Sequence, residues 1–477
     1  MFLYNSRHLG LLMLAGLLIL LPACSVGPDY VKPTVEIPSA FKEGLGWKVA
    51  QPGDAALTEK WWQLFNDTTL DNLEEQVNIS NLNIVVAEAQ FRQARALVEA
   101  SRSAFYPTLT IGAAASRAQG SANTGRGQGG ASSDFLLPVN LSWEIDVWGR
   151  IRRSVEASKS SFQASAADLA ALKLSVHAEL ASDYFQLRSL DALKQYLDES
   201  VAYYQKSLEL TRNRYAAGIV SRVDVLQAET ILKSTQASMI DLDVQRSQLE
   251  HAIALLIGKP ASSFSLPLQP LSNPPPHIPV VLPSELLERR PDIASTERHM
   301  SAANAQIGVE RAAYYPTVKL GTSIGLEASD IAKWLTWPSR FWSVGPTISE
   351  TVFDGGLRRA QNEQVLAAYD ATVASYRQTV LNAFKEVEDN LAALRTLENE
   401  AKIQDEAVES ARQTVIVTMN QYKAGIVSYL NVISAQNTEL ANKRTSIGIL
   451  ERRMVAAVLL VKAVGGGWNT DTIFKEK

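Results

Sequence analysis

A seven-residue segment, Tyr215-Ala-Ala-Gly-Ile-Val-Ser221, recurs 207 residues later as Tyr422-Lys-Ala-Gly-Ile-Val-Ser428. In both copies the central glycine stands 69 residues after one glycine and 40 residues before another. Agreement in sequence and in spacing together indicates an internal duplication, in which each repeat is one supersecondary unit. Residues 260–283 lie between the copies and hold eight of the 19 prolines, so we expect an extended strap there.

The 68 residues before each of these glycines, 150–217 and 357–424, contain neither glycine nor proline. They are rich in good helix formers, and each would reach about 100 Å as one continuous helix. Because glycine readily adopts the left-handed conformation that ends a helix, we expect returning helices over 221–257 and 428–464. An apolar seam predicts packing against other long helices: Val373, Tyr376, Val380, Ala383, Val387, Leu391 and Leu394. An earlier helix is expected over 70–102, with a counterpart over 292–311.

Short segments with alternating polarity come before each long helix, two per copy, at 108–111, 139–146, 317–320 and 342–348. Such segments match the length of a tilted membrane strand, although a half-buried sheet of a soluble domain has the same pattern. Aromatic residues cluster at their ends, as in an interfacial girdle: Phe105, Tyr106, Trp148, Tyr314, Tyr315, Trp334, Trp337 and Phe341. Four strands cannot close a barrel, and open edges are not tolerated in lipid. If these strands cross a membrane, several chains must share one barrel.

The N-terminus has the pattern of an export signal. An apolar run over 9–23 ends in Leu21-Pro22-Ala23-Cys24, which is typical of a lipoprotein cleavage site except for its proline. We therefore expect Cys24 to be lipidated and to become the first residue of the mature protein. The alternative is ordinary cleavage nearby, with Cys24 as an incidental thiol. A single cysteine excludes a disulfide within the chain.

Other classes of function have little support. The formal charge of −4 argues against nucleic-acid binding, and the 46% apolar content argues against disorder. The segment Gly125-Arg-Gly-Gln-Gly-Gly130 matches a dinucleotide fingerprint but lacks the helix that must follow it. The histidines show no metal-binding spacing. We therefore expect no catalytic residue, no cofactor and no metal.

Seven short motifs, taken in order, resemble the TolC/OprM-type outer membrane factors, specifically their lipoprotein branch. The motifs are Cys24-Ser-Val-Gly-Pro-Asp-Tyr30, Trp61-Trp62-Gln-Leu-Phe65, Phe105-Tyr-Pro107, Trp143-Glu-Ile-Asp-Val-Trp-Gly149, Arg289-Arg-Pro-Asp-Ile293, Phe353-Asp-Gly-Gly356 and Gly465-Gly-Gly-Trp468. The resemblance covers essentially the whole mature chain.

The resemblance implies a mainly α-helical homotrimer with a membrane β-barrel. Three chains of four strands would give a twelve-strand barrel in the outer membrane. That barrel would continue into a twelve-helix α-barrel in the periplasm of a Gram-negative bacterium, surrounded by an equatorial belt. The implied function is the passive exit duct of a tripartite efflux pump, with a periplasmic adaptor and an inner-membrane transporter as partners. The alternatives are the exit duct of a type I protein secretion system and a lipid-anchored periplasmic coiled coil without a pore.

By motif alignment, the resemblance also places a periplasmic gate just past the helix turns. Its expected residues are Arg222, Asp224, Leu430, Asn431 and Ser434, flanked by Arg214 and Tyr422. Contacts between Arg222 and Asp224 are expected to help close the gate, although capping of a helix is an equally simple role for Asp224. Family members often carry aspartate where Asn431 or Ser434 stands, so a dense acidic ring is not expected here. The turns at Tyr215, Gly218, Tyr422 and Gly425 are the expected adaptor contacts.

These observations give an expected domain organisation. The expected segments are a signal peptide at 1–23, a lipid-anchored segment at 24–60, a first outer-membrane-efflux repeat at 61–259, a proline-rich linker at 260–283, a second repeat at 284–468 and a tail at 469–477.

Overall fold

The computed structural model describes residues 25–44, 60–121, 123, 130–278 and 283–468 of the chain. The expected signal peptide and Cys24 lie outside the described residues. The chain divides into two compact units, each of which is described by itself. The first contains Gln90–Ser165 and Ser295–Arg377 together with the N-terminal segment up to Thr34, and the second contains Val35–Ala89, Ala166–Ala294 and the chain from Gln378 onward.

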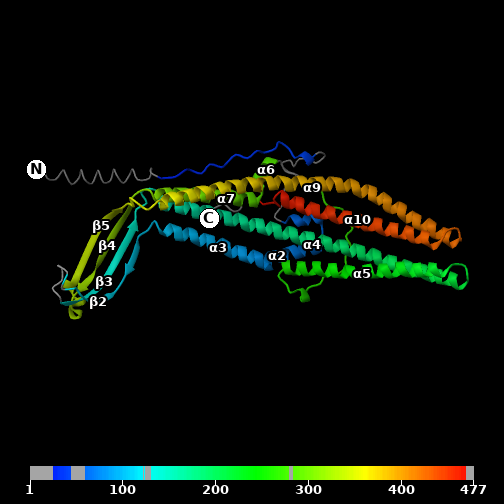
Figure 1. The fold of residues 1–477 in the computed structure, drawn as a ribbon, viewed down its shortest axis with the longest axis horizontal. Helices are drawn as coiled ribbons and strands as arrows, with labels where there is room; N and C mark the ends of the chain where they lie inside the picture. The colour runs from blue at the N-terminus through cyan, green and yellow to red at the C-terminus, as the bar shows by residue number, and fades with distance from the viewer. Residues whose placement is uncertain (1–24, 45–59, 122, 124–129, 279–282, 469–477) are drawn as a thin grey trace. The chain divides into compact units, whose positions relative to one another are not determined.

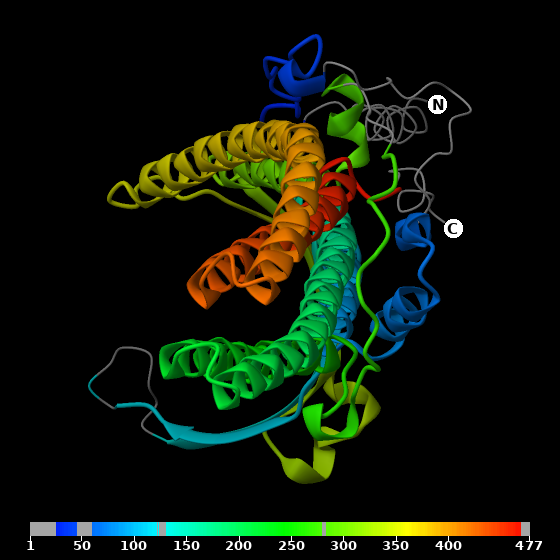
Figure 2. The same ribbon diagram turned by 90° about the vertical axis from the view of Figure 1, so that its right-hand side faces the viewer.

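The four expected long helices are present. They are α4 at Arg150–Ala216, α5 at Arg222–Leu256, α9 at Leu357–Lys423 and α10 at Tyr429–Ala463. In the second unit, α5 lies along α4 and α10 lies along α9, so that each pair forms a helical hairpin (Figures 1 and 2). In the described part of the chain, no helix combines the length and the apolar character needed to cross a membrane.

The helix expected over 70–102 is wrong as a single element. It is split at Asn81 into α2 at Thr68–Ser80 and α3 at Leu82–Ser103. The buried amide of Asn81 donates from Nδ2 to the Leu256 carbonyl at 2.7 Å, and its Oδ1 accepts from the Ile84 amide at 3.1 Å. This asparagine therefore stops one helix and caps the next, which α-helical periodicity alone could not reveal. Its counterpart, α7 at Pro291–Ala312, is continuous and follows the short α6 at Pro283–Arg289.

In its described residues, 260–278, the strap after α5 follows the expected extended path except for one short turn, and Pro283 already begins α6. Buried Arg188 donates to the Pro267 carbonyl at 2.7 Å, and Arg246 donates to the Leu266 carbonyl at the same distance. Both arginines also pair with the fully buried Asp191. The remaining short elements are η2 at Lys42–Gly44, η3 at Trp61–Phe65, η4 at Ala261–Ser263, α8 at Ile331–Trp334 and η5 at Trp337–Ser339.

The first unit holds one antiparallel sheet in the order β1-β3-β4-β5, with β2 also paired to β3. The strands are β1 at Thr108–Ile111, β2 at Ala114–Gln119, β3 at Ala131–Glu144, β4 at Thr317–Ala328 and β5 at Arg340–Ser349. Sequence analysis expected four strands, but the first is interrupted between Ile111 and Ala114 while its register against β3 is unchanged. Pro138 stands opposite this gap and has no amide hydrogen to donate, so the pair keeps only the bond from the Gly112 amide to the Pro138 carbonyl at 3.0 Å.

The sheet register sorts apolar and polar residues onto opposite faces. Ile111 pairs with Val139, Val139 with Ile324, and Ile324 with Trp342, so four strands contribute to one apolar row. Because side chains alternate along each strand, the residues between them, such as Asn140 and Ser323, lie on the other face. Ile111, Ile324 and Trp342 are all more than half exposed in the chain taken alone. Along this row, the apolar face therefore has no cover within the described chain.

The end of the sheet next to α4 is joined to the N-terminal segment. The Val26 amide donates to the Trp148 carbonyl at 3.0 Å. The Trp148 ring stacks on Tyr315 at 4.8 Å, and its indole nitrogen donates to the Pro316 carbonyl at 2.7 Å. Gly27, at φ +108°, approaches Gly308 of α7 so closely that a Cβ would lie 2.5 Å from its Cα. The described chain thus starts beside one end of the strands.

The expected apolar seam of α9 is confirmed for six of its seven positions, since Val373 alone is not fully buried. In the second unit, a further core forms around Trp61 and Phe65 of η3, where the Phe65 and Phe185 ring centroids are 4.9 Å apart. His177 stacks on Trp62 at 4.6 Å and lies 2.6 Å from Glu74, so this histidine has a packing role.

Candidate functional site: the helix turns

The two helix turns of the second unit have the same backbone geometry. In the first, the Gly218 amide donates to the Tyr215 carbonyl and the Ile219 amide to the Arg214 carbonyl, both at 2.9 Å, and Gly218 has φ +73°. The second turn repeats this pair of bonds at 3.0 and 2.9 Å around Gly425, at φ +78°. This is a Schellman ending, which needs a residue that tolerates the left-handed region. The duplicated heptapeptide is therefore explained by the reversal of the chain.

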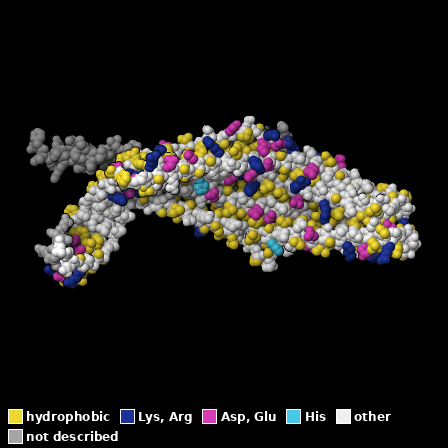
Figure 3. All heavy atoms as spheres, in the orientation of Figure 1, with side chains coloured by type: hydrophobic (Ala, Val, Ile, Leu, Met, Phe, Trp, Pro, Cys, Tyr) yellow, Lys and Arg dark blue, Asp and Glu magenta, His cyan; other side chains and the backbone are white. Residues whose placement is uncertain are grey.

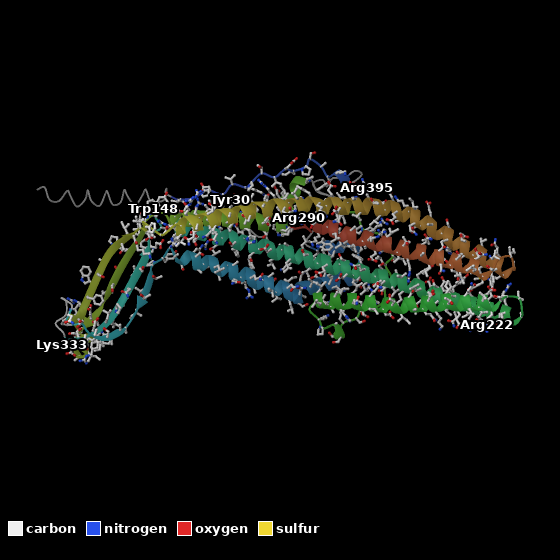
Figure 4. The ribbon with its side chains drawn as sticks, in the orientation of Figure 1. Tyr30, Trp148, Arg222, Arg290, Lys333 and Arg395 are labelled. Carbon is white, nitrogen blue, oxygen red and sulfur yellow. The ribbon has the colours of Figure 1, made fainter. Side chains whose placement is uncertain are left out.

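The helices that leave the turns start differently in the two copies. Ser221 accepts from the Val223 amide at 3.1 Å, and the Asp224 carboxylate accepts from the Ser221 amide at 3.2 Å, which forms a capping box. In the second copy Asn431 takes the place of Asp224, and the Ser428 side chain makes no such cap. Asp224 therefore has the capping role that the sequence left open. Residues two apart on a helix do not face each other, so Arg222, which is exposed at the turn (Figure 4), cannot pair with Asp224 of its own helix.

Two tyrosines that meet edge to face fill the space between the hairpins. Tyr422 and Tyr429 are both buried, with ring centroids 5.1 Å apart. The hydroxyl of Tyr429 lies 2.9 Å from the Ser207 hydroxyl, and that of Tyr422 donates to the Thr211 hydroxyl at 3.5 Å. They belong to an apolar core made by both hairpins: Tyr204, Leu208, Ala228, Ile231, Leu232, Met419, Tyr422, Tyr429 and Val432. The two hairpins are thereby packed together inside one chain.

Arg214 joins the first turn directly to the second. Its guanidinium donates to the Lys423 carbonyl at 2.7 Å and lies 5.0 Å from the centre of the Tyr422 ring. Lys423 is the last residue of α9, where unpaired carbonyls concentrate negative partial charge. A cation at this position satisfies one of those carbonyls and stabilises the helix end. The structure thus brings Arg214 and Tyr422 together, as neighbours of the expected gate.

Asn431 and Ser434 share one groove between α9 and α10. The cavity has a volume of about 370 Å³ and is lined by Ala411, Thr414, Thr418, Gln421, Val427, Asn431, Ser434, Ala435 and Thr438. Every residue in this lining is uncharged, and hydroxyl and amide groups dominate it. Leu430 is exposed next to the groove. These residues are therefore available at the surface of the hairpin, unlike Tyr422 and Tyr429.

Sequence reasoning missed Tyr429, Ser207 and Thr211. A signal for Tyr429 was present, because the 207-residue offset aligns it with Arg222. One copy therefore carries a buried ring where the other carries an exposed cation. The internal comparison could have identified this position as one where the repeats have different neighbours. Ser207 and Thr211 left no such signal, because hydroxyl residues within long helices are common.

The family model described as outer membrane efflux protein matches residues 73–259 and 282–466. The probable efflux pump outer membrane protein TtgC of Pseudomonas putida is 29% identical over 467 residues, which are 97% of this chain and 96% of that protein. The solved outer-membrane channel OprN is 30% identical, with a TM-score of 0.88 over 93% of this chain and 100% of that one. The open state of the MtrE outer membrane channel of Neisseria gonorrhoeae is 25% identical, with a TM-score of 0.80 over 94% of this chain and 100% of that one.

The chain belongs to the outer membrane efflux protein family. Its relatives are channels rather than enzymes, and their barrel and helical-barrel architecture is the fold of this chain. The protein is located in the outer membrane of a Gram-negative bacterium, extends into the periplasm, and serves as the exit duct of an efflux pump.

Replacement of Arg214 should loosen the ends of the hairpins. Arg214→Gln removes a charge-assisted hydrogen bond and a cation–π contact, which together contribute about 1–3 kcal/mol. We expect faster hydrogen exchange at the amides of Gly425 and Ile426. The matched control is Arg212→Gln, because the exposed Arg212–Glu229 pair at 3.7 Å contributes about 0–1 kcal/mol. Equal exchange in both variants would contradict the assigned role.

Stability should depend on the ionisation of Tyr429 at high pH. Burial, first of all, raises the pKa of Tyr429 from 10.0 to about 12. The folded state thus favours the neutral phenol. The contribution of Tyr429 to the free energy of unfolding is complete below the ordinary pKa of 10.0 and is lost as the pH rises through about 12. We expect the difference in thermal unfolding midpoint between wild type and Tyr429→Phe to shrink over that range. A difference that stays constant from neutral pH to about pH 12 would rule this out.

Proposed function

We propose that three copies of the chain assemble into one passive duct. The observation that carries this proposal is the sheet, which presents a largely exposed apolar face and, in the described chain, has β1 and β2 along one edge and β5 along the other. Lipid can cover the face, but it cannot satisfy the backbone groups of the edges. Pairing of β1 with β5 of the next copy satisfies both edges, and three copies reach the strand number that a barrel needs.

We infer that the periplasmic mouth is lined by Arg222, Leu430, Asn431 and Ser434. All four are exposed in the single chain, so they are free to face an opening. Arg214 and Tyr422 act behind them by keeping the two hairpins together. Since the groove at Asn431 and Ser434 is uncharged, the mouth holds few fixed negative charges and selects weakly between ions.

We also propose that the turns bind the periplasmic adaptor, which connects the duct to the inner-membrane transporter. Tyr215 is 46% exposed whereas its counterpart Tyr422 is 2% exposed. Tyr215 and the glycine turns at Gly218 and Gly425 are therefore the direct contacts, and Tyr422 supports the second turn from within. Two similar turns per chain give six related grooves in a trimer, which suits an adaptor ring of matching symmetry.

We propose that Cys24 is lipidated. Its neighbour Ser25 lies against Gly149, because a Cβ on that glycine would be 3.2 Å from the Ser25 Cα. An acyl chain on Cys24 would therefore enter the bilayer beside the end of the strands that carries Trp148 and Tyr315, and would tether the chain next to its own barrel. Incorporation of labelled palmitate should be lost in Cys24→Ser, and retained label in that variant would disprove the assignment.

A change of charge at the mouth should change ion selectivity. Asn431→Asp combined with Ser434→Asp adds two carboxylates per chain, so in planar bilayers the cation-to-anion permeability ratio should rise by roughly threefold or more. The control, Asn431→Gln with Ser434→Thr, keeps the charge and should leave the reversal potential in a salt gradient unchanged. If the acidic variant forms channels of unaltered selectivity, these residues do not line the mouth. If the wild type forms no channel, the duct itself is disproved.

A further inference from the structure

The connection between β4 and β5 together with Arg340, the first residue of β5, which we call the outer loop (residues 329–340), is held in one conformation by its own hydrogen bonds. The Asp330 carboxylate accepts from the Ala332 amide at 2.9 Å and starts α8. The Lys333 carbonyl accepts from the hydroxyls of Thr336 and Ser339 at 2.6 and 2.7 Å. These bonds join α8 to η5, so the side chains of the outer loop are presented in fixed directions.

This ordered loop exposes large apolar side chains. Trp337 is 77% exposed, and Ile331 and Leu335 are about as accessible. Ordered loops on soluble surfaces rarely present three such residues together, and an exposed apolar cluster of this kind usually has a partner. In the space-filling view, hydrophobic side chains occur together with basic and acidic ones at the end of the sheet that carries the outer loop (Figure 3). Lys333 marks this end in Figure 4, and Trp148 marks the other end of the strands.

The outer loop folds toward the apolar face of the sheet. The Trp334 ring packs against Phe135, with centroids 5.9 Å apart, and Phe135 is two residues from Leu137 on the apolar face of β3. Arg340 pairs in register with Leu326, so it stands at the end of the same face. By contrast, Phe341, which we expected in the girdle, lies on the polar face, where a Cβ on Gly325 would meet its ring at 2.9 Å.

Basic side chains of the outer loop stand close to acidic residues of the strands, since Arg340 lines one cavity with Asp134 and Glu327. Lys333 and Arg340 are exposed, and the Arg340 guanidinium lies 4.1 Å from the centre of the Trp337 ring. Among the described acidic residues at this end, Glu327 and Asp134 belong to the polar face by strand alternation, and the Asp330 carboxylate is used as a helix cap. Two exposed cations of the outer loop, Lys333 and Arg340, therefore accompany its indole rings, and Arg340 stands at the end of the apolar face.

We propose that the outer loop binds anionic, phosphate-bearing lipid in the outer leaflet. Trp337, Leu335 and Ile331 enter the boundary between acyl chains and headgroups, and Lys333 and Arg340 bind the phosphates. Indoles prefer this depth of a bilayer, and basic side chains close to it bind anionic headgroups. The proposal rests on insertion of the sheet in the outer membrane, and goes beyond the duct because it gives the protein a lipid site of defined chemistry.

The charged part of the site is tested in phosphatidylcholine nanodiscs, with or without bisphosphorylated lipid A. The double variant Lys333→Gln with Arg340→Gln should bind lipid A about tenfold more weakly than wild type, as measured by native mass spectrometry. The control, Lys385→Gln with Arg412→Gln, removes two exposed cations of α9 and should bind like wild type. Equal lipid A binding by all three proteins would overturn the proposal. Entry of all three proteins into nanodiscs shows that the sheet inserts in the membrane. Equal lipid A binding would then overturn the lipid site alone and leave the proposed duct intact.

The apolar part is tested by fluorescence quenching with phosphatidylcholine brominated close to the headgroup. Trp337→Phe should lower the quenched fraction of the emission, whereas Trp468→Phe, which alters an indole of the second unit, should not lower it. An unchanged quenched fraction in Trp337→Phe would show that the outer loop does not enter lipid. A contact between copies is the competing explanation. It would be revealed if Leu335→Asn lowered the heat resistance of the trimer in lipid-free detergent, and that result would also overturn the proposal.

Discussion

Every backbone amide and carbonyl that enters hydrocarbon needs a partner in the protein, and this constraint governs the rest of the structure. The chain builds a sheet whose inner strands, β3 and β4, are paired on both sides, whereas β1 and β2 on one side and β5 on the other keep open edges. A single chain therefore presents an apolar face for lipid but does not form a closed barrel. In the trimer that we propose, pairing between copies would supply the missing hydrogen bonds, and the long helices that follow each pair of strands would be brought into a ring by the same closure.

The duplication gives the two halves of the chain the same pair of helices. At a few equivalent positions, however, the two copies carry different residues or bury them differently. The two turns share one backbone geometry, because both need a left-handed glycine to reverse the chain. Their surroundings differ. Tyr422 and Tyr429 are buried against the first hairpin, while the equivalent residues, Tyr215 and Arg222, remain exposed. Within a chain, the two hairpins are thus joined by tyrosine rings and hydroxyl groups. In the trimer that we propose, the contact between hairpins of neighbouring chains would be made by other residues.

The sequence predicted the architecture well where one physical rule dominated. Absence of glycine and proline predicted α4 and α9, alternation predicted the faces of the sheet, and the paired glycines predicted the hairpins. It failed where a long-range contact decided the outcome. Asn81 breaks a helix by bonding to Leu256, 175 residues away in the chain, and Pro138 interrupts a ladder whose partner strand gives no warning of it. At the turns, the sequence suggested an ion pair for Asp224, but local capping uses that carboxylate.

The central claim, that neighbouring copies complete the sheet, is tested most directly by cysteine cross-linking between its two edges. Cysteine at Thr110 on β1 would be combined in turn with cysteine at Ser343, Gly345 or Thr347 on β5, and oxidised in intact membranes. A disulfide requires the two Cα atoms to lie within about 7 Å. We predict that one of these registers gives dimers and trimers on a non-reducing gel, with no larger species. Monomers alone at every register, or a ladder that continues beyond the trimer, would contradict the account.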